Sequence, residues 1–174
     1  MREKVRAETL ARFMKLLGRG ERKSTRVYFV GGASAVLLGW RDTTIDVDLK
    51  IVPDADEILR KLPRLKEELH LNIELASPDD FVPALPGWEE RSIYIGREGA
   101  IEFFHYDFYG QALAKIERGH TTDLNDVREM IERQLVDPAQ LLKLFSRVED
   151  KLYKYPAIDA ESLRQAVEQI ASET

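Results

Sequence analysis

The chain contains no cysteine, and this absence excludes several kinds of chemistry at once. Disulfide bonds, zinc sites built on thiolates and cysteine nucleophiles cannot form. The three histidines are scattered along the sequence and do not make a metal cluster. Any metal ion is therefore expected to be held mainly by oxygen ligands.

Long hydrophobic runs are missing as well. No apolar stretch approaches the roughly 20 residues of a membrane span. The first residues, Met1-Arg2-Glu3-Lys4, are too charged for the apolar segment of a secretory signal. The formal net charge of −5 argues against broad electrostatic adhesion to nucleic acid, although it allows a local basic patch. We therefore expect a cytoplasmic protein with no membrane partner.

What the chain does contain is sufficient for a folded core. It has 174 residues, of which 44% are hydrophobic. We expect an α/β (α+β) fold with a mixed sheet of about five strands flanked by helices. The expected division is a core with an N-terminal helix over 1–137 and a helical C-terminal region over 138–174.

Apolar spacing and breaker residues predict the order of the elements. An amphipathic helix is expected over 2–17, and Pro63 is expected to kink or divide a helix over 56–69. A β-hairpin is expected from 93–95 and 101–106, after a proline-rich loop over 77–88. Strands are expected over 26–30, 43–52 and 71–76, and further helices over 34–39, 109–118, 123–135, 138–153 and 160–172.

Two linked segments carry the strongest chemical signal. The first strand ends at Gly31-Gly32 and a short helix follows, and at such a turn backbone N–H groups can meet a phosphate. Ser34 either donates its hydroxyl to the phosphate or caps the helix, and the residue type does not separate these roles. Asp46 and Asp48 stand two apart on the next strand, so their side chains share one face about 6–7 Å apart and can converge on a cation.

Each half of this pattern also has an ordinary explanation. Glycine pairs serve many turns that bind nothing, and alternating acids are common on the solvated face of a half-buried strand. The two halves together, at this spacing, favour a site for a phosphate and a metal ion.

The segments Gly31-Gly32-Ala33-Ser34 and Asp46-Val47-Asp48 resemble the signature of nucleotidyltransferases of the DNA polymerase β superfamily. The likeness is strongest to minimal members of the abortive-infection toxin type (AbiEii-like and DUF6036-like). A looser second part resembles the helical lysine and the acid-rich helix start of that group, at Lys115 and Asp123. The resemblance covers roughly residues 26–131.

This resemblance implies that a hydroxyl attacks the α-phosphate of a nucleoside triphosphate such as ATP and that pyrophosphate is released. Asp46 and Asp48 would bind Mg²⁺ or Mn²⁺. Glu74, the only acid of the third strand, is expected to supply the third carboxylate, which binds the metal and activates the hydroxyl. Lys115 is expected to bind the β- or γ-phosphate, with Asp123 as a further residue of the nucleotide site.

Two classes of function follow. The first is an enzyme that transfers a nucleoside monophosphate to a hydroxyl of an RNA (tRNA) or a protein, as the toxin of a toxin–antitoxin or phage-defence system. Its partners would include a cognate antitoxin or a second copy of the chain. The second is a nucleotidyltransferase-like module that binds a nucleotide or a partner without chemistry. The position of Glu74 relative to Asp46 and Asp48 separates the two, because catalysis needs a base within reach.

Overall fold

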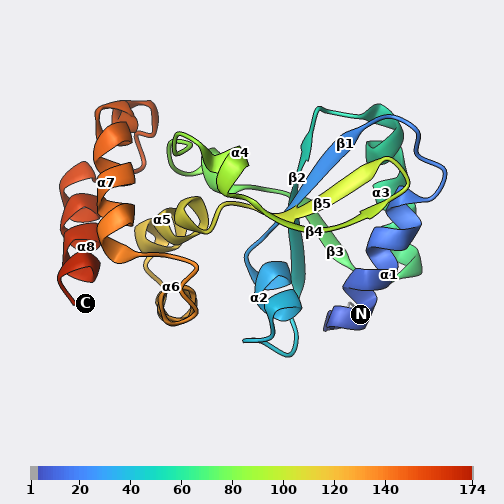
Figure 1. The fold of residues 1–174 in the computed structure, drawn as a ribbon, viewed down its shortest axis with the longest axis horizontal. Helices are drawn as coiled ribbons and strands as arrows, with labels where there is room; N and C mark the ends of the chain where they lie inside the picture. Colours follow the sequence, from blue (N-terminus) through green and yellow to red (C-terminus); the bar gives the residue numbers. More distant parts are fainter. Residues whose placement is uncertain (1–3, 174) are drawn as a thin grey trace. The chain divides into compact units, whose positions relative to one another are not determined.

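The structure is a computed structural model that describes residues 4–173, and its sheet has five strands in the order β3-β2-β1-β5-β4 (Figure 1). Strand β1 (Thr25–Val30) is antiparallel to β2 (Asp46–Val52) and parallel to β5 (Ile101–His105). One edge strand, β3 (Asn72–Leu75), is parallel to β2, and the other, β4 (Ile93–Glu98), is antiparallel to β5. The predicted mixed sheet is confirmed.

The contacts between residues divide the chain into two compact units. The first comprises Met1–Ser77 and Ser92–His105, and the second comprises Pro78–Arg91 and Tyr106–Thr174. The sheet belongs to the first unit, and the second unit is helical. The sequence-based boundary at residue 137 stays a prediction.

In the first unit, three helices cover one face of the sheet. These are α1 (Ala7–Gly18), α2 (Gly32–Leu38) and α3 (Asp56–Glu68), and their buried residues form one core with alternate residues of the strands. The ring of Phe29 stacks on that of Phe103, with 5.9 Å between the centroids. The remaining strand residues therefore point to the opposite face of the sheet, which we call the polar face.

The second unit is built from helices. Helix α5 (Phe108–Arg118) contacts α6 (Thr121–Glu132), α7 (Pro138–Val148) and α8 (Ala160–Ser172), and α7 also contacts α8. The predicted helical C-terminal region is confirmed. Within residues 4–173, no helix is both long and apolar enough to cross a membrane. The elements are η1 (Pro78–Asp80), α4 (Trp88–Arg91), α5 (Phe108–Arg118), α6 (Thr121–Glu132), α7 (Pro138–Val148), η2 (Glu149–Lys154) and α8 (Ala160–Ser172).

Pro63 was expected to kink or divide its helix, and it does not divide it; the kink stays a prediction. Helix α3 continues through Pro63, which lies on the exposed side. Leu62 and Leu65 are buried in the core on either side of the proline, so tertiary packing holds the two turns together although one helical hydrogen bond cannot form.

Other boundaries differ by a few residues. Helix α1 begins at Ala7, and the first two residues of the predicted helix lie outside the described part of the chain. Strand β4 continues to Glu98, so the hairpin turn is shorter than expected. Helix α4 was not predicted, because four residues in a proline-rich segment give no periodic pattern.

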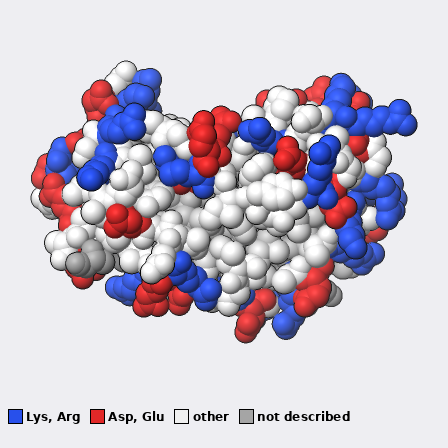
Figure 2. Space-filling view, viewed as in Figure 1, with Lys and Arg blue, Asp and Glu red and all other residues white. Residues whose placement is uncertain are grey.

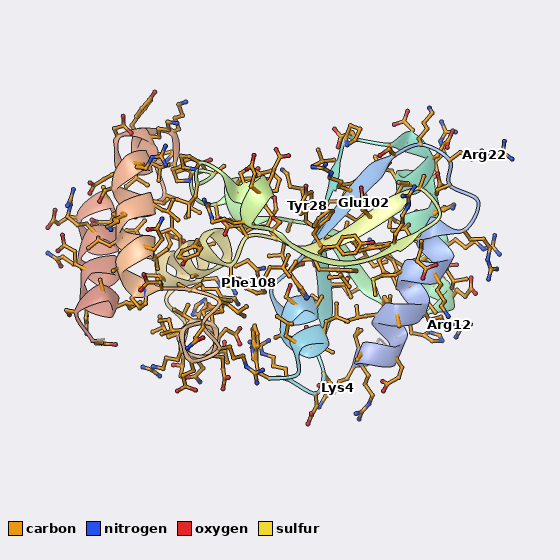
Figure 3. The ribbon with its side chains drawn as sticks, in the orientation of Figure 1. Lys4, Arg12, Arg22, Tyr28, Glu102 and Phe108 are labelled. Carbon is orange, nitrogen blue, oxygen red and sulfur yellow. The ribbon has the colours of Figure 1, made fainter. Side chains whose placement is uncertain are left out.

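A buried ion pair fixes the start of α5, whose first residue, Phe108, is labelled in Figure 3. The Asp107 carboxylate is fully buried and accepts hydrogen bonds from the backbone N–H groups of Tyr109 at 3.1 Å and Gly110 at 3.4 Å. The Arg91 guanidinium donates to both carboxylate oxygens, at 3.1 and 2.7 Å. Asp107 therefore caps the helix and joins it to α4.

We expect Asp107→Ala to lower the free energy of unfolding by about 3 kcal/mol, because it leaves a partly buried guanidinium without its carboxylate and removes a helix cap. The control is Asp159→Ala at the exposed cap of α8, where the Asp159 side chain accepts from the backbone N–H of Ser162 at 3.0 Å. That change should cost about 1 kcal/mol. Urea unfolding followed by circular dichroism measures both, and equal losses would contradict the assigned role.

Candidate active site on the polar face of the sheet

The carboxylates of Asp46 and Asp48 lie on the polar face. Both residues are half-buried on β2, whereas Val47 and Leu49 between and after them are fully buried in the core. The burial of these two apolar residues fixes the direction of the strand's other side chains. The strand therefore presents the two acids together, as its alternation predicts.

The neighbouring strand brings a third carboxylate to this face. In the parallel pairing of β3 with β2, Asn72 lies beside Asp46 and Glu74 lies beside Asp48. Laterally paired residues project from the same face of a sheet. The Asn72 amide donates a short hydrogen bond to Asp46 Oδ1 and another, of 3.1 Å, to Glu74 Oε1. Glu74 thus shares a face with both acids of the motif.

The chemistry of these side chains suits a hard cation, because carboxylate oxygens are the ligands that Mg²⁺ prefers. Among residues 4–173, however, no three Asp, Glu or His side chains form a group placed to hold a metal ion together. The amide of Asn72 instead connects Asp46 and Glu74. The carboxylate oxygens of Asp46 and Asp48 therefore suit a hard cation such as Mg²⁺. A metal-binding role for Glu74 stays a prediction.

The glycine turn lies against the acidic strand. Gly31 joins β1 to α2 with φ 62° and ψ −126°, a backbone conformation that is open essentially to glycine alone. A Cβ atom on Gly31 would lie 3.9 Å from Asp48 Oδ2. The two segments of the sequence motif therefore meet in space.

Gly32 has a packing reason to lack a side chain. A Cβ atom on Gly32 would overlap the Thr44 hydroxyl and would lie 3.6 Å from a guanidinium nitrogen of Arg41. The Thr44 hydroxyl also donates to the carbonyl oxygen of Asp46 at 3.1 Å. Gly32 thus lets the segment just before β2 pack closely against the turn. The guanidinium of Arg41 lies beside the turn.

Ser34 is fully buried inside α2. Its hydroxyl donates to the carbonyl of Phe29 at 3.3 Å and lies 2.9 Å from Nδ1 of His105. The side chain does not cap the helix. The expected contact with a phosphate would require the hydroxyl to leave both partners, so the phosphate role of Ser34 stays a prediction without geometric support.

Burial lowers the pKa of His105 to about 4, so its imidazole is neutral at pH 7. The Ser34 hydroxyl has one hydrogen, and Phe29 accepts it. Nδ1 of His105 is therefore assigned as the donor to Ser34.

Lys115 and Asp123 lie in the second unit, where they form a buried charge cluster. The Lys115 ammonium is 2.9 Å from Asp126 Oδ2 and 3.5 Å from Asp123 Oδ1, and Arg118 donates to both oxygens of Asp123. Burial raises the pKa of Asp123, but hydrogen bonds and charges from Arg118 and Lys115 outweigh burial and lower the pKa below its ordinary value. Their nucleotide-binding role stays a prediction.

Comparison with known families bears directly on this site. Residues 7–172 match the family described as nucleotidyltransferase of unknown function (DUF6036). The chain belongs to this family. The match spans both units, from α1 to the last turn of α8. No match was found among curated proteins or among solved structures. The predicted nucleotidyltransferase family is confirmed, whereas the wider superfamily and the toxin likeness stay predictions.

The motif that pointed to this nucleotidyltransferase family did not select every residue of the site. The motif does not include Asn72, yet its amide donates hydrogen bonds to two of the three carboxylates. Thr44 belongs to the same arrangement through Gly32. The sequence feature that could have identified Asn72 is its spacing from Glu74, because residues 72 and 74 share one face of a four-residue strand.

We expect the protein to lose stability as the pH falls from 6.5 towards 4, because the unfolded chain binds a proton at His105 before the folded chain does. The His105 contribution to this loss should reach about 3 kcal/mol at most. Unfolding free energies between pH 7.5 and 4.5 measure it.

His105→Asn keeps an amide donor for Ser34 and cannot titrate, so it should flatten this part of the pH dependence. His120→Asn, at an exposed position, should keep the slope of the unaltered protein. Equal slopes for the His105→Asn variant and the unaltered protein would contradict the burial of a neutral imidazole.

Proposed function

We propose that this protein transfers a nucleoside monophosphate from a nucleoside triphosphate to a hydroxyl of an RNA or a protein, with Mg²⁺ or Mn²⁺ as the cofactor. One observation carries the proposal: the pairing of β3 with β2 places Glu74 beside Asp48, on the face that also carries Asp46. Membership of a nucleotidyltransferase family supports the same reaction class. The toxin role, the antitoxin partner and the cytoplasmic location rest on the sequence resemblance and composition.

Asp46 and Asp48 are proposed to hold the metal ion through their carboxylate oxygens. Magnesium needs only one or two carboxylates from a protein when phosphates and water complete its shell. When bound, the ion neutralises charge on the phosphate oxygens and on the leaving group. Gly31 places backbone against Asp48, and Arg41 adds a cation at the turn, so both are proposed to face the triphosphate.

Glu74 is proposed as the general base. Its exposed carboxylate takes the proton of the attacking hydroxyl, whose oxygen forms a bond to the α-phosphorus. The bond between the α-phosphorus and the bridging oxygen breaks, and pyrophosphate leaves with the electron pair. Asn72 holds Glu74 by one hydrogen bond and Asp46 by another, so it orients the base relative to the metal ligand. Lys115 and Asp123 are retained for nucleotide binding on the resemblance alone.

A second candidate function is a nucleotide-binding module without chemistry. The hydrogen bonds from Asn72 favour it, because they tie Asp46 to Glu74 and no group of three acidic or histidine ligands forms among the described residues. If this arrangement persists with nucleotide bound, Asp46, Asp48 and Glu74 do not hold a metal ion together, as two-metal catalysis would need.

Incubation with each α-labelled triphosphate, Mg²⁺ or Mn²⁺ and either total RNA or a protein mixture tests the proposal. Asp46→Asn and Asp48→Asn should abolish transfer of the label, and Glu74→Gln should lower its rate by about 100-fold or more. The matched control is Glu57→Gln at an exposed position of α3, which should leave the rate unchanged. Transfer that survives Asp46→Asn would contradict the site, and triphosphate binding without transfer would favour the binding module.

A further inference from the structure

Three aromatic rings form a ladder across the polar face. The ring of Tyr28 on β1 stacks on that of Phe104 on β5, with 5.2 Å between centroids and 24° between the planes. Tyr94 on β4 meets Phe104 edge to face at 5.7 Å and 74°. We call Tyr28, Phe104 and Tyr94 the aromatic ladder.

The ladder lies on the same face as the acids. Tyr28 pairs laterally with Lys50, which is two residues beyond Asp48 on β2 and projects from the same side of the strand. Val30, two residues after Tyr28, pairs with Asp48 itself. The ladder therefore begins one side-chain step from the carboxylates and runs from β1 to the β4 edge. Tyr28 on β1 and Glu102 on β5 are labelled in Figure 3.

The ladder becomes more exposed along its length. Tyr28 is 1% exposed, Phe104 is half-buried and Tyr94 is 54% exposed. Phe104 faces away from the core residue Phe103, because the two residues are consecutive in the alternation of β5. The buried end fixes the rings in place, while the outer end offers a ring surface to a ligand.

Two cations accompany the ladder. Arg26 is exposed, and its guanidinium carbon lies 5.9 Å from the centroid of Phe104. Lys50 lies beside Tyr28. Glu102 pairs with Arg26 on the same face, so this is not a broad basic patch. Figure 2 likewise shows basic and acidic side chains interspersed over the first unit on the face in view. Affinity for a nucleic acid here would depend on stacking and on a few phosphate contacts.

We propose that the aromatic ladder binds an unpaired base of the acceptor RNA, stacked on Tyr94, with Arg26 and Lys50 at the adjacent phosphates. This rests on the proposed function and names RNA as its acceptor class. Aromatic rings on sheet surfaces, with cations beside them, match the repeat of base and phosphate in a single strand. Tyr94 lies on the same face of the sheet as Asp48 and Glu74, so an RNA with a base stacked on Tyr94 lies on the face that carries these acids.

Fluorescence anisotropy with a labelled single-stranded RNA of about ten nucleotides, without triphosphate, tests the proposal. Tyr94→Ala should raise Kd by about 5- to 150-fold, the loss expected for one stacked base, and Tyr94→Phe should retain nearly all the affinity. The control is Tyr153→Ala at another exposed tyrosine, 76% exposed, which should not change Kd. Arg26→Gln should reduce the slope of log Kd against log salt concentration by about 0.7.

Three results of binding measurements would overturn the ladder proposal. They are failure of the unaltered protein to bind RNA, unchanged RNA binding in Tyr94→Ala, and weakened triphosphate binding in Tyr94→Ala with RNA binding intact. The third would assign the ring to the donor base. Labelling of a protein acceptor that Tyr94→Ala leaves unchanged would overturn the proposal as well.

The assay contains no triphosphate, so its outcome is independent of catalysis. RNA binding that depends on Tyr94 without any nucleotide transfer would refute the proposed function and leave the ladder. Nucleotide transfer to RNA that Tyr94→Ala leaves unchanged would refute the ladder proposal and keep the proposed function.

Discussion

The parallel pairing of β3 with β2 is the constraint on which the candidate site depends. A slip of one residue would turn Glu74 towards the core and Ile73 towards the polar face. Leu71 and Ile73 are each 2% exposed in the core of the first unit, so the slip would expose both. The burial of two apolar side chains therefore holds the third carboxylate beside Asp48. The register of the β2–β3 pairing therefore sets both the core packing and the geometry of the site.

A second constraint joins the glycine turn to the acidic strand. The Thr44 hydroxyl occupies the space that a side chain on Gly32 would need, and it also binds the carbonyl of Asp46. Gly31 lies against Asp48. The turn and the acids are thus parts of one packed arrangement, which explains why their spacing in the sequence carried more information than either segment alone.

Most of the fold followed from local patterns, because alternation and breaker residues report directly on burial. The mixed sheet, the pairing of the two acids on one face and the helical C-terminal region were predictable in this way. Asn72 as the link between Asp46 and Glu74 and the continuation of α3 through Pro63 were not predicted. Each depends on contacts between segments far apart in sequence, which no local periodicity encodes. The family membership supports the proposed reaction class, and the acceptor has to be argued from the surface beside the site.

Asp46, Asp48 and Glu74 are proposed to form one catalytic site for a metal-bound triphosphate. A crystal structure with Mn²⁺ and a non-hydrolysable triphosphate is the sharpest test, because anomalous scattering locates the ion. We expect an ion bound by Asp46 and Asp48, with the α-phosphate next to it and the Glu74 carboxylate turned to the same space. An ion bound elsewhere, or a bound triphosphate with Glu74 directed away from it, would show that these three residues do not form the site.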